Sequence, residues 1–396
     1  MTLRPPALGR GRAAALLAAT FLALSGCTSP GGGSGPEAAP TPAGPTLAGP
    51  GRLVVARCER WAAPSPTTAD RKVHVVTATA HAATDGREEA RRVATLPDLA
   101  TSATLCDPTL TTAVSATADR QAFNADFSLI AGTVAPHSGA MKRAAAFTLP
   151  GGRAASTAPA DGPGEDRRPL FQEGTSVLWY ETAGRKLTSR DLAVRGAEPA
   201  PRGTAPGEDF ALDGDRPWPA RPFGTKPEGV SVAPGGTVAA GYTQQNAVLW
   251  RGDQVTGSTL GVVEPLLLGT PAEPGHQVVP GSAGVPSGCV PRLWLDGGHL
   301  LCGTRDNLYR VGFAADFSRV EGVDALLPPE KRFVSGAVLS PDGKALAYLS
   351  AADGTESIHR VDLVPDAVPV KLADLPPTAP ATDDPENGLP HLVAWL

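Results

Sequence analysis

Residues 338–350, VLSPDGKALAYLS, decide the fold of this chain. Pro341 fixes the backbone φ at the start of a turn, and Asp342 and Gly343 tolerate the positive φ that a tight turn needs. On either side, apolar residues form short runs, and residues 345–350 alternate with the two-residue period of a strand. The stretch therefore predicts a β-hairpin.

Degenerate copies of this hairpin recur upstream. In each copy a turn lies at the same position before a short pair of apolar residues. Successive copies are spaced by about 55 residues, near or slightly above the period of about 40 to 50 residues that repeats of several strands have. A further strand-like run follows the turn in four copies, at residues 187–192, 247–251, 307–312 and 357–363. The residues that anchor the six turns are Gly343, Gly297, Gly235, Gly174, Asp126 and Asp70.

In residues 340–350, SPDGKALAYLS, the chain resembles the repeat of the TolB-like and WD40-like β-propeller families. The resemblance covers most of residues 70–363, but the Ser-Pro-Asp-Gly turn is complete in one copy and the chain has no WD dipeptide. It implies an all-β fold, a β-propeller with six blades or, alternatively, seven. A coincidental series of hairpins in a sandwich or a solenoid is the competing interpretation.

Composition agrees with an all-β fold. The 45 Gly and 41 Pro among 396 residues leave little room for long helices. Residues 150–168 and 194–227 are dominated by Gly, Pro, Ala, Arg and Asp, and we expect them to be loops between the blades. The chain ends in a strand-like run, residues 391–396, HLVAWL. In a propeller such a run closes the ring by pairing the C-terminal strand with the N-terminal one, which removes an exposed edge. Trp395 is then expected in the core.

The N-terminus predicts export. Arg4, Arg10 and Arg12 precede an apolar run of 11 residues, 13–23, which is too short to span a bilayer and is typical of a signal peptide. Residues 24–27, LSGC, are similar to a bacterial lipobox. An ordinary secretory signal with an incidental cysteine is the alternative.

The lipobox resemblance implies cleavage after residue 26 and a diacylglycerol on Cys27, which would anchor the protein on the extracytoplasmic face of the cell membrane. Residues 28–51 are rich in Gly, Pro, Ala and Ser, with Glu37 as their one charge, and predict a tether. The expected organisation is a signal peptide at 1–26, a lipidated cysteine and tether at 27–51, and a propeller domain at 52–396.

Four further cysteines, an even number in an oxidising compartment, predict two disulfides. Four cysteines allow three connectivities, and sequence proximity favours Cys58 with Cys106 and Cys289 with Cys302. No CxxC pair is present, so we predict no metal site.

The sequence carries no catalytic signature. It lacks GxSxG, HExxH, P-loop and dinucleotide-binding motifs, and its seven histidines are scattered. We predict no catalytic residue and no cofactor, and the ligand-binding residues stay unknown. Removing the three arginines of the signal peptide takes the formal net charge from −5 to −8, and the sequence has no run of clustered Lys and Arg with interleaved aromatic residues, so we predict no nucleic-acid partner.

Three polar or aromatic features have ordinary explanations. Asp213 with Asp215, and the acidic residues at 383, 384 and 386, are interpreted as solvated loops rather than calcium sites. Trp218, between two prolines in a segment that could cover one mouth of the central channel, is either an exposed ligand-gripping ring or a seal on the core.

Two classes of function follow. The first is a monomeric, membrane-anchored lipoprotein whose TolB-like propeller binds or scaffolds a protein, peptide or glycan of the cell envelope. The second is an extracytoplasmic propeller enzyme that acts on carbohydrate, which a pair of buried carboxylates facing the channel would favour.

Overall fold

The computed structural model describes residues 46–62, 72–106, 115–138, 140–158, 164–206, 209–219, 229–243, 246–253, 261–262, 266–270, 277–377 and 388–396. The fold below is that of the compact unit Pro45–Leu396. The predicted signal peptide, Cys27 and the tether as far as residue 45 lie outside the described residues.

The hairpin at residues 338–350 forms as predicted, between β23 (Phe333–Leu339) and β24 (Ala345–Ala352), with Leu339 opposite Leu346. Its turn is held by side chains, since Ser340 Oγ accepts a hydrogen bond from the backbone N–H of Ala345 at 2.9 Å. Asp342 Oδ1 accepts from the N–H of Lys344 at 3.1 Å. The Ser-Pro-Asp-Gly sequence thus satisfies the backbone groups that a tight turn leaves unpaired.

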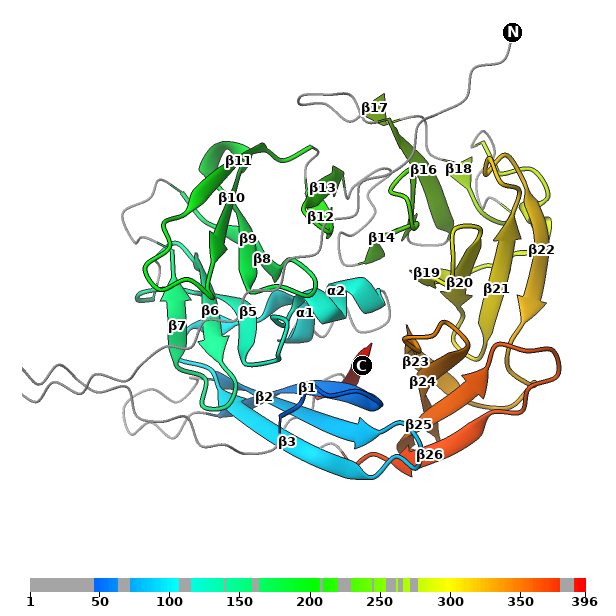
Figure 1. The fold of residues 1–396 in the computed structure, drawn as a ribbon, viewed down its shortest axis with the longest axis horizontal. Coiled ribbons are helices and arrows are strands. Elements are labelled where there is room, and N and C mark those ends of the chain that lie inside the picture. The colour runs from blue at the N-terminus through cyan, green and yellow to red at the C-terminus, as the bar shows by residue number, and fades with distance from the viewer. Residues whose placement is uncertain are drawn as a thin grey trace, which may run out of the picture. The chain divides into compact units, whose positions relative to one another are not determined.

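Repetition of this unit gives an all-β propeller of six blades, which confirms the predicted fold class (Figure 1). The strands of each blade are given in order from the centre outward. Blade 1 consists of β27 (Pro390–Trp395), β1 (Arg52–Ala62), β2 (Lys72–Ala82) and β3 (Glu88–Thr95), and blade 2 consists of β4 (Ala100–Thr101), β5 (Leu129–Val134), β6 (Arg143–Thr148) and β7 (Ala154–Thr157). Blade 3 consists of β8 (Arg167–Phe171), β9 (Val177–Thr182), β10 (Lys186–Asp191) and β11 (Ala200–Thr204).

The last three blades follow the same order. Blade 4 consists of β14 (Ser231–Val232), β15 (Val238–Tyr242), β16 (Ala247–Asp253) and β17 (Gly261–Val262), and β18 (Leu266–Leu267) also pairs with β16. Blade 5 consists of β19 (Val290–Trp294), β20 (His299–Gly303), β21 (Leu308–Phe313) and β22 (Val320–Ala325). Blade 6 consists of β23, β24, β25 (Thr355–Asp362) and β26 (Val370–Asp374). The helical elements are α1 (Ala103–Cys106), α2 (Ala116–Gln121) and the 3-10 turns η1 (Ala183–Arg185) and η4 (Ser282–Gly284). Within the described part, no helix is long and apolar enough to cross a membrane.

Both faces of β24 are buried, and its sequence is apolar on both faces. Leu346 and Tyr348 join the core cluster shared with blade 5, whereas Ala347 and Leu349 join the cluster shared with blade 1. Each sheet is packed between two neighbours, so every second residue faces a different blade. The hydrophobic core therefore consists of the interfaces between neighbouring blades, arranged around the ring.

The ring closes through its termini. Strand β27 pairs antiparallel with β1, and Leu53 lies opposite Trp395. Leu392 and Val393 are fully buried. Trp395, which the sequence placed in the core, is half-buried, and the guanidinium of Arg360 lies 5.6 Å from its ring centroid.

Some assignments made from the sequence were wrong. Residues 150–168 and 194–227, interpreted as loops because of their Gly and Pro content, contain β7 and β11 and a two-stranded hairpin, β12 (Phe210–Asp213) with β13 (Arg216–Pro219). This hairpin is additional to the six sheets. The anchor Asp70 lies outside the described residues, and the strand after it, β2, is the third strand of its blade rather than the second.

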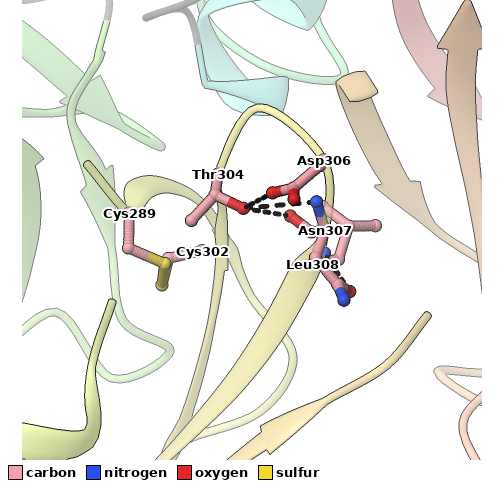
Figure 2. Close-up of a disulfide and its surroundings, with 6 residues drawn as sticks. All are labelled: Cys289, Cys302, Thr304, Asp306, Asn307 and Leu308. Carbon is pink, nitrogen blue, oxygen red and sulfur yellow. Dashed lines mark hydrogen bonds between the residues drawn. A yellow bond between two sulfur atoms is a disulfide. The ribbon is translucent and has the colours of Figure 1, made fainter. Parts of the chain in front are cut away.

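Two disulfides are present, Cys58–Cys106 and Cys289–Cys302, in the pairing that sequence proximity favours. The first joins β1 of blade 1 to α1, and the second joins Cys289, the residue before β19, to Cys302 in β20 of blade 5 (Figure 2). Figure 2 also shows the turn after Cys302, where Thr304 Oγ1 donates to Asp306 Oδ1 at 2.9 Å.

Removing the two disulfides separately should give unequal losses of stability. The Cys58–Cys106 bond spans 48 residues and the Cys289–Cys302 bond spans 13, which correspond to about 4 and about 3 kcal/mol by the chain-entropy estimate. Urea unfolding of the two Cys→Ala double variants measures these losses. Equal losses, or a larger loss for the shorter loop, would contradict the estimate.

Candidate functional site

Helix α2 lies at the centre of the ring (Figure 1). It contacts the first strands of three blades, β27, β19 and β23, so it occupies the place of a central channel. Ser115 caps it, because its hydroxyl oxygen accepts from the N–H of Ala118 at 3.2 Å and donates to the carbonyl of Val230 at 3.1 Å. A six-residue helix is thereby fixed among strands that belong to distant parts of the sequence.

A buried acid and a buried histidine join this helix to the closing strand. Asp119 Oδ1 lies 2.9 Å from Nδ1 of His391 in β27, and the two side chains are 5% and 3% exposed. An ionised carboxylate only accepts hydrogen bonds, so with Asp119 ionised the donor of this bond is the N–H at Nδ1 of His391. Nε2 of His391 has no hydrogen-bond partner among the described residues.

A buried cation completes the cluster. Arg292 in β19 is 4% exposed, and its burial lowers the pKa of the guanidinium to about 10, while the charges of Asp119 and Tyr242 act in the opposite direction. Burial likewise raises the pKa of Tyr242, at the end of β15. The helix and three blades thus contribute one polar group each to what we call the central cluster: Asp119, His391, Arg292 and Tyr242.

The two residues after Asp119 fix the helix in place. The guanidinium of Arg120 donates to the carbonyls of Phe123 and Asn124, both at 3.0 Å. Gln121 Nε2 donates to the carbonyl of Leu212 in β12 at 2.8 Å, which connects the helix to the extra hairpin. The helix is therefore held at both ends by hydrogen bonds to the surrounding chain.

In chemical terms the central cluster holds a histidine whose free Nε2 could act as a base or a ligand, oriented by a carboxylate. A cavity on the side of the helix that faces Thr117, Gln121 and Phe210, and lined by no member of the central cluster, measures about 20 Å³, which is room for about one water molecule. Sites for small organic ligands are usually about 300 to 1,000 Å³.

Away from the central cluster, the buried carboxylates of Asp166 and Glu181 and the partly buried carboxylate of Glu356 have a raised pKa, and desolvation is the main cause for each. Asp166 lies 3.9 Å from Arg143 of β6, and Glu356 of β25 lies 3.0 Å from Arg57 of β1. Glu181 lies in β9, where the charge of Asp209 adds to the effect of burial. In the described part, the partner that the structure gives Asp119 is a histidine rather than a second carboxylate.

The residues singled out from the sequence lie elsewhere. Cys27 and the acidic residues at 383, 384 and 386 are outside the described residues, and Asp213 pairs with Arg216 at 3.3 Å. Trp218 is buried against Val230 and Trp250, so it seals the hairpin onto the core. The described residues contain no group of three acidic, histidine or cysteine side chains able to hold a metal ion.

Sequence reasoning missed the central cluster, because its members are separated by up to 272 residues and share no motif. Two weak signals were available. Ser115 before Ala116, Thr117 and Asp119 is a helix-start pattern inside an all-β chain, and His391 opens an otherwise apolar terminal strand.

No protein-family model and no curated protein matches the sequence. Solved structures with a similar fold include TolB from Acinetobacter baumannii, at 13% identity over 86% of this chain and 67% of that one, with a TM-score of 0.36. A putative 6-phosphogluconolactonase from Bacteroides uniformis matches at 12% identity over 84% and 85%, with a TM-score of 0.36. An oligogalacturonate lyase in complex with manganese matches at 14% over 76% and 73%, with a TM-score of 0.33.

Proposed function

We propose that this protein is an exported lipoprotein, anchored through Cys27 on the extracytoplasmic face of the cell membrane, whose propeller binds a protein or peptide of the cell envelope. The observation that carries the binding role is the filled centre of the ring. Helix α2 contacts the first strands of three blades there, and the cavity beside the helix measures about 20 Å³, so we infer that the partner binds on the outer surfaces of the blades.

Two further features support the proposal. The disulfides Cys58–Cys106 and Cys289–Cys302 suit an oxidising compartment, where such bonds persist. The lipobox-like residues and most of the predicted tether precede the propeller unit, which begins at residue 45 and buries Leu47 in its core, so an anchored chain would hold the ring away from the lipid surface.

The carbohydrate-enzyme alternative has less support. A glycosidase needs two carboxyl groups about 5 to 9 Å apart with a sugar between them. Asp119 instead faces His391 in a closed centre, and the carboxylates with a raised pKa contact arginines or charged groups at other places in the ring.

The anchor is tested by fractionating cells that express the full chain. We expect the wild-type protein in the membrane fraction with the mass of a lipidated Cys27, whereas the Cys27→Ala variant should leave that fraction and lack the lipid. Ser25→Ala keeps a small residue before the cleavage site and serves as the matched control, which should stay anchored. A Cys27→Ala variant that stays membrane-bound would contradict the proposal.

The binding role is tested by crosslinking in intact cells, affinity enrichment and mass spectrometry. We expect one defined envelope protein, recovered with the wild type and lost with Cys27→Ala, because the variant is no longer held beside its partner. Recovery of the same proteins with both would argue against a partner selected by anchoring.

A further inference from the structure

A groove of about 560 Å³ opens at the rim of the ring, between blades 5 and 6. One wall is the end of β22, with Asp324, and the other is the turn 363–369 between β25 and β26; Figure 1 places this turn next to the end of β22. We call it the rim groove, and the residues that define it are Arg310, Asp324, Leu327, Val364, Asp366 and Val368.

The floor of the rim groove is rigid. Leu327 is buried, and Asn307 holds its backbone through two hydrogen bonds of 3.1 Å, one from Asn307 Nδ2 to the Leu327 carbonyl and one from the Leu327 N–H to Asn307 Oδ1. Asn307 belongs to the turn that follows the Cys289–Cys302 disulfide (Figure 2). A preformed floor lowers the entropy that binding has to overcome.

The outer wall is apolar and exposed. Val364 and Val368 are 61% and 78% exposed, and Val370, at the start of β26, is also exposed. Single exposed aliphatic residues are common on protein surfaces, but three within seven residues beside a groove indicate a contact surface. The groove is large enough for several side chains of an extended peptide.

The charges of the rim groove are unbalanced. Arg310 is paired with Asp324 at 2.8 Å, and the neighbouring Asp362 is paired with Arg360 at 2.9 Å. The exposed carboxylate of Asp366 has no hydrogen bond and no ion pair in the described part of the chain. The groove therefore offers one uncompensated negative charge between two exposed valines, which complements a cation flanked by aliphatic groups.

The same charge argues against two occupants that the chain itself could supply. The tether, residues 28–51, has Glu37 as its one charge and would bring a second carboxylate to Asp366. A second copy of the chain without its predicted signal peptide is acidic, with a formal net charge of −5 − 3 = −8, and a two-fold contact through this groove would place the two Asp366 side chains in one interface.

We propose that the rim groove binds an extended segment of a partner protein that carries lysine or arginine between aliphatic residues. This inference rests on the proposed function, which supplies a partner, and it names the surface and the chemistry by which that partner is recognised.

The test uses the purified full chain and two labelled peptides, AVKVPVKA and its acidic counterpart AVEVPVEA, with binding followed by fluorescence anisotropy. We expect saturable binding of the basic peptide, at least about tenfold weaker binding of the acidic one, and loss of affinity as salt rises from about 50 to 500 mM. Binding of both peptides with equal affinity, or of neither, overturns the proposal.

Variants locate the binding site. Val368→Glu and Asp366→Lys each change an exposed side chain of the groove and should weaken binding of the basic peptide at least about tenfold. Val194→Glu is the matched control, since Val194 is 56% exposed in the turn after β10, and it should bind like the wild type. Equal effects of Val368→Glu and Val194→Glu overturn the assignment to this groove.

Photo-crosslinking separates this inference from the proposed function. With benzoylphenylalanine at 368 or at 194 in intact cells, the groove predicts capture of the anchored partner at 368 only. Capture at 194 only leaves the proposed function standing and overturns the groove. A crosslinked dimer, or a crosslink to residues 28–51, at position 368 identifies the occupant as this chain and also overturns it.

Discussion

Deleting residues 391–396 should abolish the cooperative unfolding of the propeller or lower its Tm by about 10 °C or more. These residues form most of β27, which pairs with β1 and buries Leu392 and Val393 completely. Burying two aliphatic side chains of this size contributes about 3 to 6 kcal/mol, before the newly exposed edge of β1 is counted. A domain stable by about 5 to 15 kcal/mol would lose much of its margin.

A graded version avoids a variant that fails to fold. Leu392→Ala should cost about 3 kcal/mol, because it leaves a cavity at a fully buried position. Val364→Ala, at a position 61% exposed, should change the free energy of unfolding by less than about 0.5 kcal/mol. Urea unfolding measures both, and a truncated protein with an unchanged Tm would show that β27 does not close the ring.

The fold could be predicted from the sequence because its decisive interactions are local. The turn around Asp342 and Gly343 specifies a hairpin through side-chain hydrogen bonds within five residues, and the same device recurs at Asp126 and Asp296, whose Oδ1 atoms accept from the N–H two residues later. Repetition of a local unit then determines the global architecture. Five turns in one frame were enough to indicate a repeated blade, although the sixth anchor, Asp70, precedes the third strand of its blade rather than the second.

The predictions that were wrong are those that inferred loops from a high content of glycine and proline. Residues 200–204 and 210–219 contain Pro201, Gly203 and Pro217, yet they form β11 and the β12–β13 hairpin. Proline is tolerated at the outer edge of a blade, where no neighbouring strand requires its missing N–H. Composition therefore misassigned the edge strands and the extra hairpin.

The central cluster could not be predicted, for a different reason. Asp119 and His391 are 272 residues apart and meet only because the ring closes, so no local pattern contains the pair. The rim groove also depends on the packing of neighbouring blades, since Asp324 lies in β22 of blade 5 and Val368 lies in the turn between β25 and β26 of blade 6. Sites of this kind follow from the assembled fold.

Replacing Asp119 by Asn should destabilise the protein by about 3 kcal/mol. The substitution keeps the shape of the side chain but removes the carboxylate that accepts from His391 Nδ1 and opposes the buried charge of Arg292. Removing one partner of a buried pair leaves the remaining charge without compensation, which is costly in a low-dielectric interior. The loss is measured as the change in the free energy of unfolding in urea.

The matched control is the same substitution at the surface. Asp362 pairs with Arg360 at 2.9 Å, but its side chain is 55% exposed, and Asp362→Asn should cost less than about 1 kcal/mol. A double-mutant cycle of Asp119→Asn with His391→Gln should give a coupling energy above about 1 kcal/mol, because the residues are in direct contact. Equal losses for Asp119→Asn and Asp362→Asn, with no coupling to His391, would mean that the central cluster does not hold α2 to the closing strand. Partner binding that survives Asp119→Asn in the folded protein would in turn agree with recognition at the rim rather than at the centre.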